Sequence, residues 1–318
     1  MSISQNLIAP GVYPTMITPF TDSGEVDYHA LEQLVEWYIG HGVAGLFAVC
    51  QSSEMFALSL EERVSIARFV RERAAGRVQV VASGHISDRL EDQITELQAM
   101  AATGVQAIVL VSNRLAAMEE PDEVWKERAA LLLEAVPEIP FGVYECPYPY
   151  KRLLSPELLA WCEGTGRFQF LKDTSCHSGQ IADKLAAVQG GSLKLYNANA
   201  ATLLESLKLG AHGYSGVMGN FHPDLYAWMY RHYADRPEQA GNLQWFLGLT
   251  SVIESQYYPV NAKYYLSLEG LPIGLHTRTK DCRHLTYANR LELEQLHALT
   301  ALVREHYKLG DCGEIKDR

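Results

Sequence analysis

Eight short apolar segments, each followed by a segment with helical spacing, constrain the fold of this chain more than any other feature. The apolar segments are residues 12–17, 45–49, 78–82, 107–111, 141–144, 168–172, 194–196 and 213–215. Leu31, Leu34, Val35 and Tyr38 follow the first of them at the i, i+3, i+4, i+7 spacing of an amphipathic helix. Alternating strands and helices indicate a parallel α/β sheet, and eight such units favour closure into a (β/α)8 TIM barrel.

The alternating pattern ends near residue 223. From residue 224 onward we find helical patterns only, for example at 225–233 and 291–307. We therefore predict a barrel at residues 1–223 and a C-terminal helical extension at residues 224–318 that packs on the barrel.

The composition bears on partners and on the cellular compartment. A formal net charge of −11 repels nucleic acid and anionic membranes, so neither is an expected partner. No apolar stretch approaches membrane-spanning length, and residues 1–10 lack the pattern of a signal peptide. The six cysteines form no CxxC pair and no HExxH motif is present, so we expect free thiols, no metal, no cofactor and a cytoplasmic location.

Lys172 is the first candidate for chemistry, because functional side chains of a barrel lie at the carboxyl ends of its strands. It ends the apolar segment 168–172. Burial there disfavours the ammonium and lowers its pKa, and the neutral amine is a nucleophile that can attack a carbonyl carbon. An ion pair with the adjacent Asp173 explains the position of Lys172 equally well.

Three other strand ends carry polar groups or glycine. Tyr144 ends the neighbouring strand and could transfer protons during imine formation, although a tyrosine of the core fits the pattern too. Hydroxyl and backbone groups of residues 51–54 could hold a carboxylate, or could form an ordinary polar loop. The glycines at 213, 216 and 219 permit a close approach of substrate, or fit a tight corner of the barrel.

Several longer segments match the motifs of one known family. They are residues 11–20 (GVYPTMITPF), 24–27 (GEVD), 41–45 (HGVAG), 170–175 (FLKDTS) and 209–220 (LGAHGYSGVMGN). With the interval of 28 residues between Tyr144 and Lys172, they show that the chain resembles the dihydrodipicolinate synthase / N-acetylneuraminate lyase family from residue 11 to about residue 223.

The resemblance implies a lyase of the class I aldolase type, in which Lys172 forms a Schiff base with pyruvate or another 2-oxo acid. Tyr144 is then the proton donor and acceptor, assisted by Glu145 or by water. The resemblance also implies an aldehyde as second reactant and a homotetramer built as a dimer of dimers. The substrate-binding residues expected on this basis are Ser52, Ser53 through its backbone, Glu145, Ser215 and Gly216. Arg114 and Lys151 are candidates for binding a second anionic group, although solvent exposure of both is the alternative.

The chain departs from the family pattern at the proton relay. Gln51 stands where the family has the first threonine of its strand 2 motif, and Leu115 stands where the synthases have a tyrosine. Pro149 replaces the arginine that binds the second substrate in the synthases. Of the relay, only Tyr144 is retained, so we expect a divergent member of the family.

Three functions therefore remain open at the level of sequence. The first is a lyase or aldolase acting on a 2-oxo acid. The second is the synthase reaction itself, or dehydration of a 2-oxo sugar acid through the same imine. The third is a protein that binds a 2-oxo acid without turning it over, which loss of the relay favours and retention of Lys172 and Tyr144 opposes.

Overall fold

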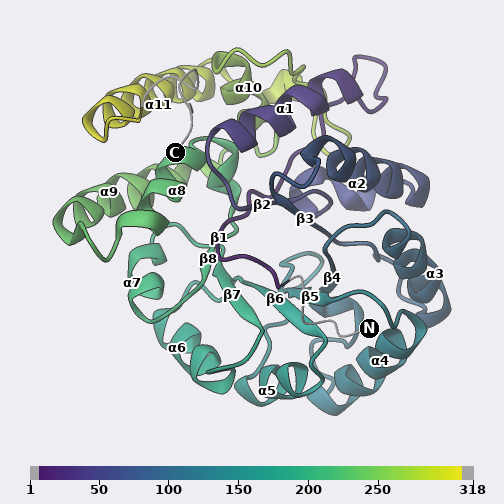
Figure 1. The fold of residues 1–318 in the computed structure, drawn as a ribbon. Helices are drawn as coiled ribbons and strands as arrows, with labels where there is room; N and C mark the ends of the chain where they lie inside the picture. The colour runs from purple at the N-terminus through teal and green to yellow at the C-terminus, as the bar shows by residue number, and fades with distance from the viewer. Residues whose placement is uncertain (1–6, 310–318) are drawn as a thin grey trace.

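The structure is a computed structural model that describes residues 7–309. Eight parallel strands pair in the order β1-β8-β7-β6-β5-β4-β3-β2, and a parallel bridge between Thr15 and Phe47 joins the chain after β1 to β2 (Figure 1). The predicted (β/α)8 TIM barrel is therefore confirmed. The strands are β1 (Gly11–Val12), β2 (Gly45–Phe47), β3 (Gln79–Ala82), β4 (Ala107–Val111), β5 (Phe141–Tyr144), β6 (Phe168–Asp173), β7 (Lys194–Asn197) and β8 (Gly213–Tyr214).

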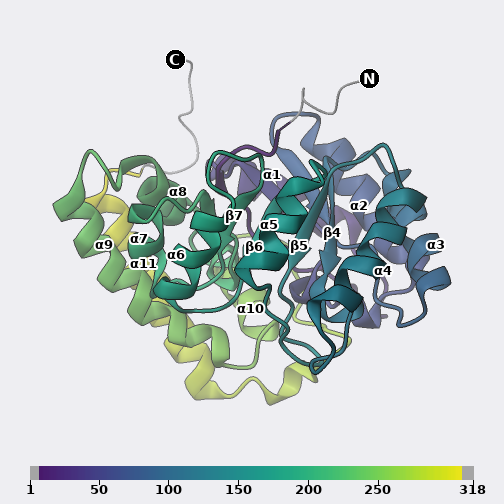
Figure 2. The same ribbon diagram turned by 90° about the horizontal axis from the view of Figure 1, so that it is seen from below.

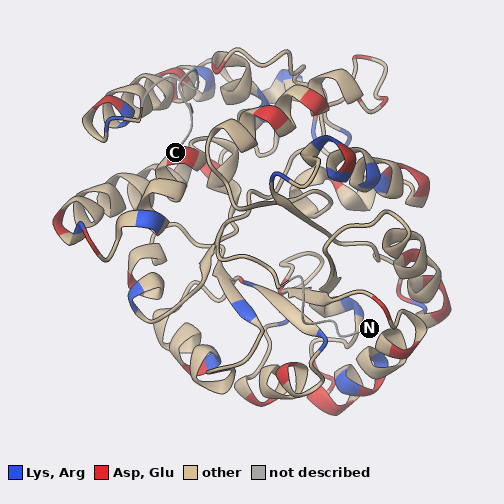
Figure 3. Cartoon of the chain, viewed as in Figure 1, with Lys and Arg blue, Asp and Glu red and all other residues tan. Residues whose placement is uncertain are grey.

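Helices α1 to α8 form a ring around the strands (Figure 1). They are α1 (Tyr28–Gly40), α2 (Leu60–Ala74), α3 (Leu90–Ala101), α4 (Asp122–Ala135), α5 (Pro156–Gly164), α6 (Ser178–Ala187), α7 (Leu203–Lys208) and α8 (Pro223–His232). Several begin at a polar cap: Asp27 and Ser155 each accept a backbone N–H of the first turn, and Ser59 and Glu62 form a reciprocal capping box. Charged residues of the barrel lie mainly on these outer helices, whereas the strands carry few, namely Lys172 and Asp173 of β6 and Lys194 of β7 (Figure 3).

Aromatic rings fill the interior of the barrel. Tyr13 contacts Phe170 and Tyr196 with ring centroids 5.5 and 5.0 Å apart, and Phe47 lies 6.0 Å from Phe170. These rings come from β2, β6, β7 and the chain just after β1, and they meet in the centre of the barrel. Gly45 makes room for them, because a Cβ at this position would lie 2.0 Å from the ring of Tyr13. The packed interior closes the barrel beneath the strand ends.

The extension consists of α9 (Pro237–Thr250), α10 (Val260–Leu268) and α11 (Tyr287–His306), with short 3-10 turns η6 (Ser251–Ser255) and η7 (Cys282–His284). The three helices lie beside α8 and α1 (Figures 1 and 2). Arg304 of α11 pairs with Asp224 of α8 at 2.7 Å and with Glu269 at 2.8 Å. Helix α8 packs on β1 and β8, so residues 224–232, which follow the predicted boundary, belong to the ring of the barrel.

Within residues 7–309, no helix has both the length and the apolar character required to cross a membrane.

Candidate active site

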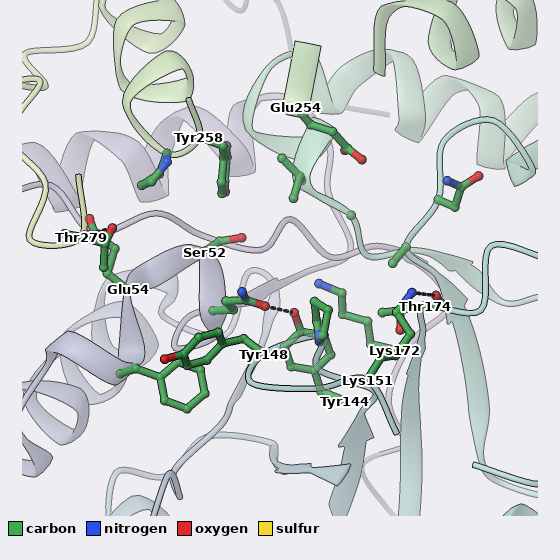
Figure 4. A pocket seen from close by; sticks show the side chains of 18 of the residues that line it. Ser52, Glu54, Tyr144, Tyr148, Lys151, Lys172, Thr174, Glu254, Tyr258 and Thr279 are labelled. Carbon is green, nitrogen blue, oxygen red and sulfur yellow. Dashed lines mark hydrogen bonds between the residues drawn. The ribbon is translucent and has the colours of Figure 1, made fainter. Parts of the chain in front are cut away.

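A pocket of about 800 Å³ opens at the carboxyl ends of the strands (Figure 4). Its wall combines strand ends with parts of the C-terminal extension. The barrel contributes Gln51, Ser52, Glu54, Phe56, Ala57, Tyr144, Pro147, Tyr148, Lys151, Lys172, Thr174, Cys176, Ala198, Asn199, Gly216 and Val217, and the extension contributes Glu254, Tyr258, Pro259, Thr279 and Lys280.

Lys172 lies in this pocket with only 4% of its surface exposed. Its Nζ is 4.4 Å from the ring centroid of Tyr144 and 5.9 Å from that of Phe47. Burial removes water from the ammonium and lowers the pKa of Lys172. The alternative of an ion pair with Asp173 is wrong, because successive strand residues point to opposite faces and Asp173 pairs with Lys184 instead.

Tyr144 faces Lys172 because the two residues are aligned in the register between β5 and β6. Its hydroxyl donates a hydrogen bond to Oε1 of Gln51 at 3.2 Å. Burial raises the pKa of Tyr144 well above its usual value, so the hydroxyl keeps its proton. Gln51, which stands where the sequence resemblance leads us to expect a relay threonine, is thus the hydrogen-bond partner of Tyr144. Its amide accepts the tyrosine hydrogen bond but is not an acid that passes a proton on.

The two serines after Gln51 have different roles. Ser52 lines the pocket, and its hydroxyl donates to Oγ1 of Thr15 at 3.1 Å. Ser53 does not line it: its hydroxyl donates to the backbone oxygens of Met16 and Ala48, and its N–H donates to the oxygen of Cys50. The expectation that the backbone of Ser53 binds substrate is not met, because that N–H already closes the turn.

Glu145 also turns away from the pocket, contrary to the prediction. It is fully buried on the opposite face of the strand end, where Oε1 accepts from Nζ of Lys184 at 2.5 Å. The same Nζ lies 2.6 Å from Oδ2 of Asp173. Burial alone would lower the pKa of Lys184, but the two carboxylates outweigh it and the pKa is raised. This buried ion cluster fixes the strand ends that carry Tyr144 and Lys172.

Of the remaining predicted residues, some line the pocket and others do not. Arg114 lies outside the pocket wall, because its Nη1 pairs with Asp88 at 2.5 Å and its guanidinium lies over Phe56. Ser215 is buried and lines no part of the pocket, whereas Gly216 does. A Cβ on Gly216 would lie 2.2 Å from the hydroxyl of Tyr214, so only glycine fits there. Lys151 lines the pocket, and its Nζ donates to the oxygen of Thr174 at 2.8 Å.

The extension supplies groups that sequence reasoning missed. Glu254 of η6 and Tyr258 enter the pocket from the side opposite Lys172 (Figure 4). The loop that carries Thr279 is held by Glu54, whose Oε2 accepts from the N–H and the hydroxyl of Thr279, each at 2.8 Å. A barrel pattern directs attention to strand ends, and no signal in the helical segment after residue 224 marks these positions.

Comparison with known proteins places this chain in a family. A sequence profile of the Dihydrodipicolinate synthetase family matches residues 9–296. The chain belongs to this family. The expected resemblance is thereby confirmed, and it extends beyond the barrel into the helical extension.

Three proteins of this family to which the chain is similar are 22–26% identical to it in sequence. The 4-hydroxy-tetrahydrodipicolinate synthase of Cyanothece sp. (strain PCC 7425) is 26% identical over 262 residues, which cover 82% of this chain and 85% of the relative. That of Shewanella sp. (strain MR-7) is 25% identical over 291 residues, 91% of this chain and 95% of the relative. YagE, a prophage protein of this family from E. coli K12 solved in complex with pyruvate, has a TM-score of 0.84 at 22% identity, covering 92% of this chain and 99% of that one. The low identities agree with a divergent member.

Proposed function

We propose that this chain is a lyase that forms a Schiff base between Lys172 and pyruvate or a related 2-oxo acid. The observation that carries the proposal is a buried amine with a lowered pKa, held beside a protonated tyrosine in a pocket at the strand ends. Such an amine is neutral more often than an exposed lysine, and the neutral form attacks a carbonyl. The family of this chain supports the same chemistry.

Imine formation needs one proton donor and one acceptor. The lone pair of Nζ attacks the C2 carbonyl, the C–O π electrons move to oxygen, and the Tyr144 hydroxyl protonates that oxygen to give a carbinolamine. A proton lost from nitrogen returns to the tyrosinate. The Tyr144 hydroxyl then protonates the C2 hydroxyl, the nitrogen lone pair expels it as water to leave an iminium, and the tyrosinate regains a proton from solvent. Gln51 positions the Tyr144 hydroxyl for this exchange through the hydrogen bond at Oε1.

The substrate carboxylate is assigned to the side of the pocket that carries Ser52. The Ser52 hydroxyl, which donates to the buried Thr15, is a hydrogen-bonding group on this wall, and Gly216 permits close approach of the substrate. Lys151 and Lys280 add positive charge to the same pocket. They favour an aldehyde that carries a carboxylate as the second reactant.

Replacement of Tyr144 by phenylalanine should slow imine formation by roughly 10²–10⁴-fold, the usual contribution of a positioned general acid–base. The variant loses only the hydroxyl and its bond to Gln51, so the pocket shape is preserved. The measurement is the initial rate at which borohydride traps the pyruvate adduct. Phenylalanine at the exposed Tyr287 is the matched control. An unchanged rate in Tyr144→Phe would remove Tyr144 from the mechanism.

A turnover assay separates a lyase from a binding protein. Pyruvate consumption is followed with acidic aldehydes, such as glyoxylate and aspartate semialdehyde, and with neutral glyceraldehyde. The reverse direction is followed as pyruvate release from 4-hydroxy-2-oxo acids. We expect turnover with at least one acidic aldehyde. A trapped adduct without any turnover would instead assign the chain as a 2-oxo acid binding protein.

We also propose a homotetramer located in the cytoplasm. Trp245, Leu249 and Val252 follow one face of α9 and η6 and expose 75%, 74% and 63% of their surfaces. Apolar side chains gathered on one exposed face are typical of contacts between subunits. The five cysteines within residues 7–309 are free thiols, which fits a reducing compartment. Sedimentation velocity of the full chain tests the assembly.

A further inference from the structure

Glu254 is the one acidic group of the pocket wall, within residues 7–309, that has no hydrogen-bond or salt-bridge partner. It lies in η6 of the C-terminal extension and lines the pocket on the wall across from Lys172 (Figure 4). The other acidic residue of the wall, Glu54, accepts bonds from the backbone N–H groups of Arg278 and Thr279. Glu54 therefore holds a loop, whereas Glu254 is available to a ligand.

Two other proton-carrying groups near Lys172 have hydrogen-bond partners, and one of them, Tyr144, is assigned the proton transfers of imine formation. The Tyr144 hydroxyl donates to Gln51, which ends the relay expected for the family. Nζ of Lys151 donates to the oxygen of Thr174 at 2.8 Å. An imine at Lys172 nevertheless needs a base for its next step, because an iminium becomes a nucleophile only after its neighbouring carbon loses a proton.

The surroundings of Glu254 suit such a base. Burial raises the pKa of its carboxyl, and the charge of Lys172 acts in the opposite direction. A carboxylate that is partly desolvated binds a proton more strongly than one in water. A positively charged iminium on Lys172 would also attract the ionised carboxylate of Glu254 across the pocket and hold it in position.

We propose that the Glu254 carboxylate is the catalytic base that converts the iminium on Lys172 into the enamine. The carboxylate takes a proton from C3 of the bound 2-oxo acid. The electrons of that C–H bond form the C2–C3 double bond, and the C2–N π electrons become the lone pair on nitrogen. Glu254 ends as the neutral acid and returns the proton when the step reverses. This inference rests on the proposed function, since it begins from the imine on Lys172.

Pyruvate in D2O tests the step without any knowledge of the second reactant. Enamine formation exchanges the methyl protons of pyruvate for deuterium, which proton NMR follows with time. Glu254→Gln should lower the exchange rate by about 100-fold or more, as expected for loss of a general base. Its borohydride-trapped adduct should form within about threefold of the wild-type rate, because the steps before the iminium do not use Glu254.

Two further variants sharpen the comparison. Glu254→Asp keeps the carboxylate on a shorter side chain and should recover part of the exchange. Glu238→Gln, an exposed change on α9, should leave both rates at the wild-type level. Glutamine at Glu254 breaks no hydrogen bond within residues 7–309, so the melting temperature of Glu254→Gln should equal that of the wild type.

The outcomes separate this inference from the proposed function. Absence of an adduct in the wild type would overturn the proposed function and this inference together. If the wild type and Glu254→Gln both form the adduct and exchange methyl protons at equal rates, the role of Glu254 alone would be overturned. So would a wild type that forms the adduct but exchanges no methyl protons, or a Glu254→Gln variant that loses adduct and exchange together.

Discussion

Substitution of Lys172 by methionine is expected to abolish the reaction of this protein with pyruvate. Methionine fills a similar volume but offers no nitrogen, so neither imine nor enamine can form. The rates of methyl-proton exchange and of aldehyde turnover should fall by roughly 10⁴-fold or more, as for loss of other covalent nucleophiles. Both are read by proton NMR under the same conditions as the wild type.

The fold should survive this substitution. Lys172 is buried and its pKa is lowered by burial, which means that its charged form is disfavoured in the folded protein. Removing the amine should therefore leave the melting temperature unchanged or raise it. Lys208→Met, at an exposed position on α7, is the control for the loss of a lysine elsewhere. Retention of methyl-proton exchange by Lys172→Met would contradict the assignment of Lys172 as the nucleophile.

Replacement of Lys184 by methionine is expected to destabilise the protein by about 3–5 kcal/mol, the usual cost of removing one partner of a buried ion pair. Lys184 is the cation between Glu145 and Asp173, whose side chains are fully buried. Without it, the two carboxylates face each other in the interior. The free energy of unfolding, measured by urea denaturation, should fall accordingly.

A second variant distinguishes the loss of charge balance from the loss of packing. The triple replacement Lys184→Met, Glu145→Gln and Asp173→Asn removes all three charges while keeping similar side-chain volumes. It should recover a large part of the stability lost in Lys184→Met, because no buried charge is then left without a partner. A triple variant as unstable as the single one would show that packing, rather than charge, is responsible.

The barrel itself was predictable because its signal is local. Each buried strand reads as a short apolar run, and the predicted segments 107–111 and 141–144 coincide with β4 and β5. The predicted segments 12–17 and 45–49 extend past the C-terminal ends of β1 and β2. Residues 13–17 and 48–49 remain buried there although they lie beyond the paired part of each strand. Burial and strand pairing are different properties, and a sequence reports mainly the first.

The errors at the site follow from the direction of side chains. Tyr144 and Lys172 were assigned correctly to one pocket because both end strands of the same barrel. Glu145 was assigned to it as well, although strand alternation places the residue after an inward side chain on the outer face. Applied to residues 144 and 172, the same rule predicts that Glu145 and Asp173 lie together outside. Their partner Lys184 comes from α6, a long-range contact that strand alternation does not reveal.

Glu254 could not be predicted from the barrel motifs. It belongs to a short turn between α9 and α10, and its place in the pocket wall depends on how the extension packs on the barrel. That packing depends on long-range contacts such as the pair between Arg304 and Asp224. A sequence pattern locates residues along a helix, but it does not show which turn reaches the pocket.

Borohydride reduction in the presence of pyruvate tests the central claim most directly. After reduction and proteolysis, mass spectrometry should find one reduced pyruvate per chain, attached to the peptide that contains Lys172. Lys151 and Lys280, which line the same pocket, should remain unmodified. An adduct on either of these lysines, or no adduct with pyruvate and a panel of 2-oxo acids, would contradict the assignment of Lys172 as the nucleophile.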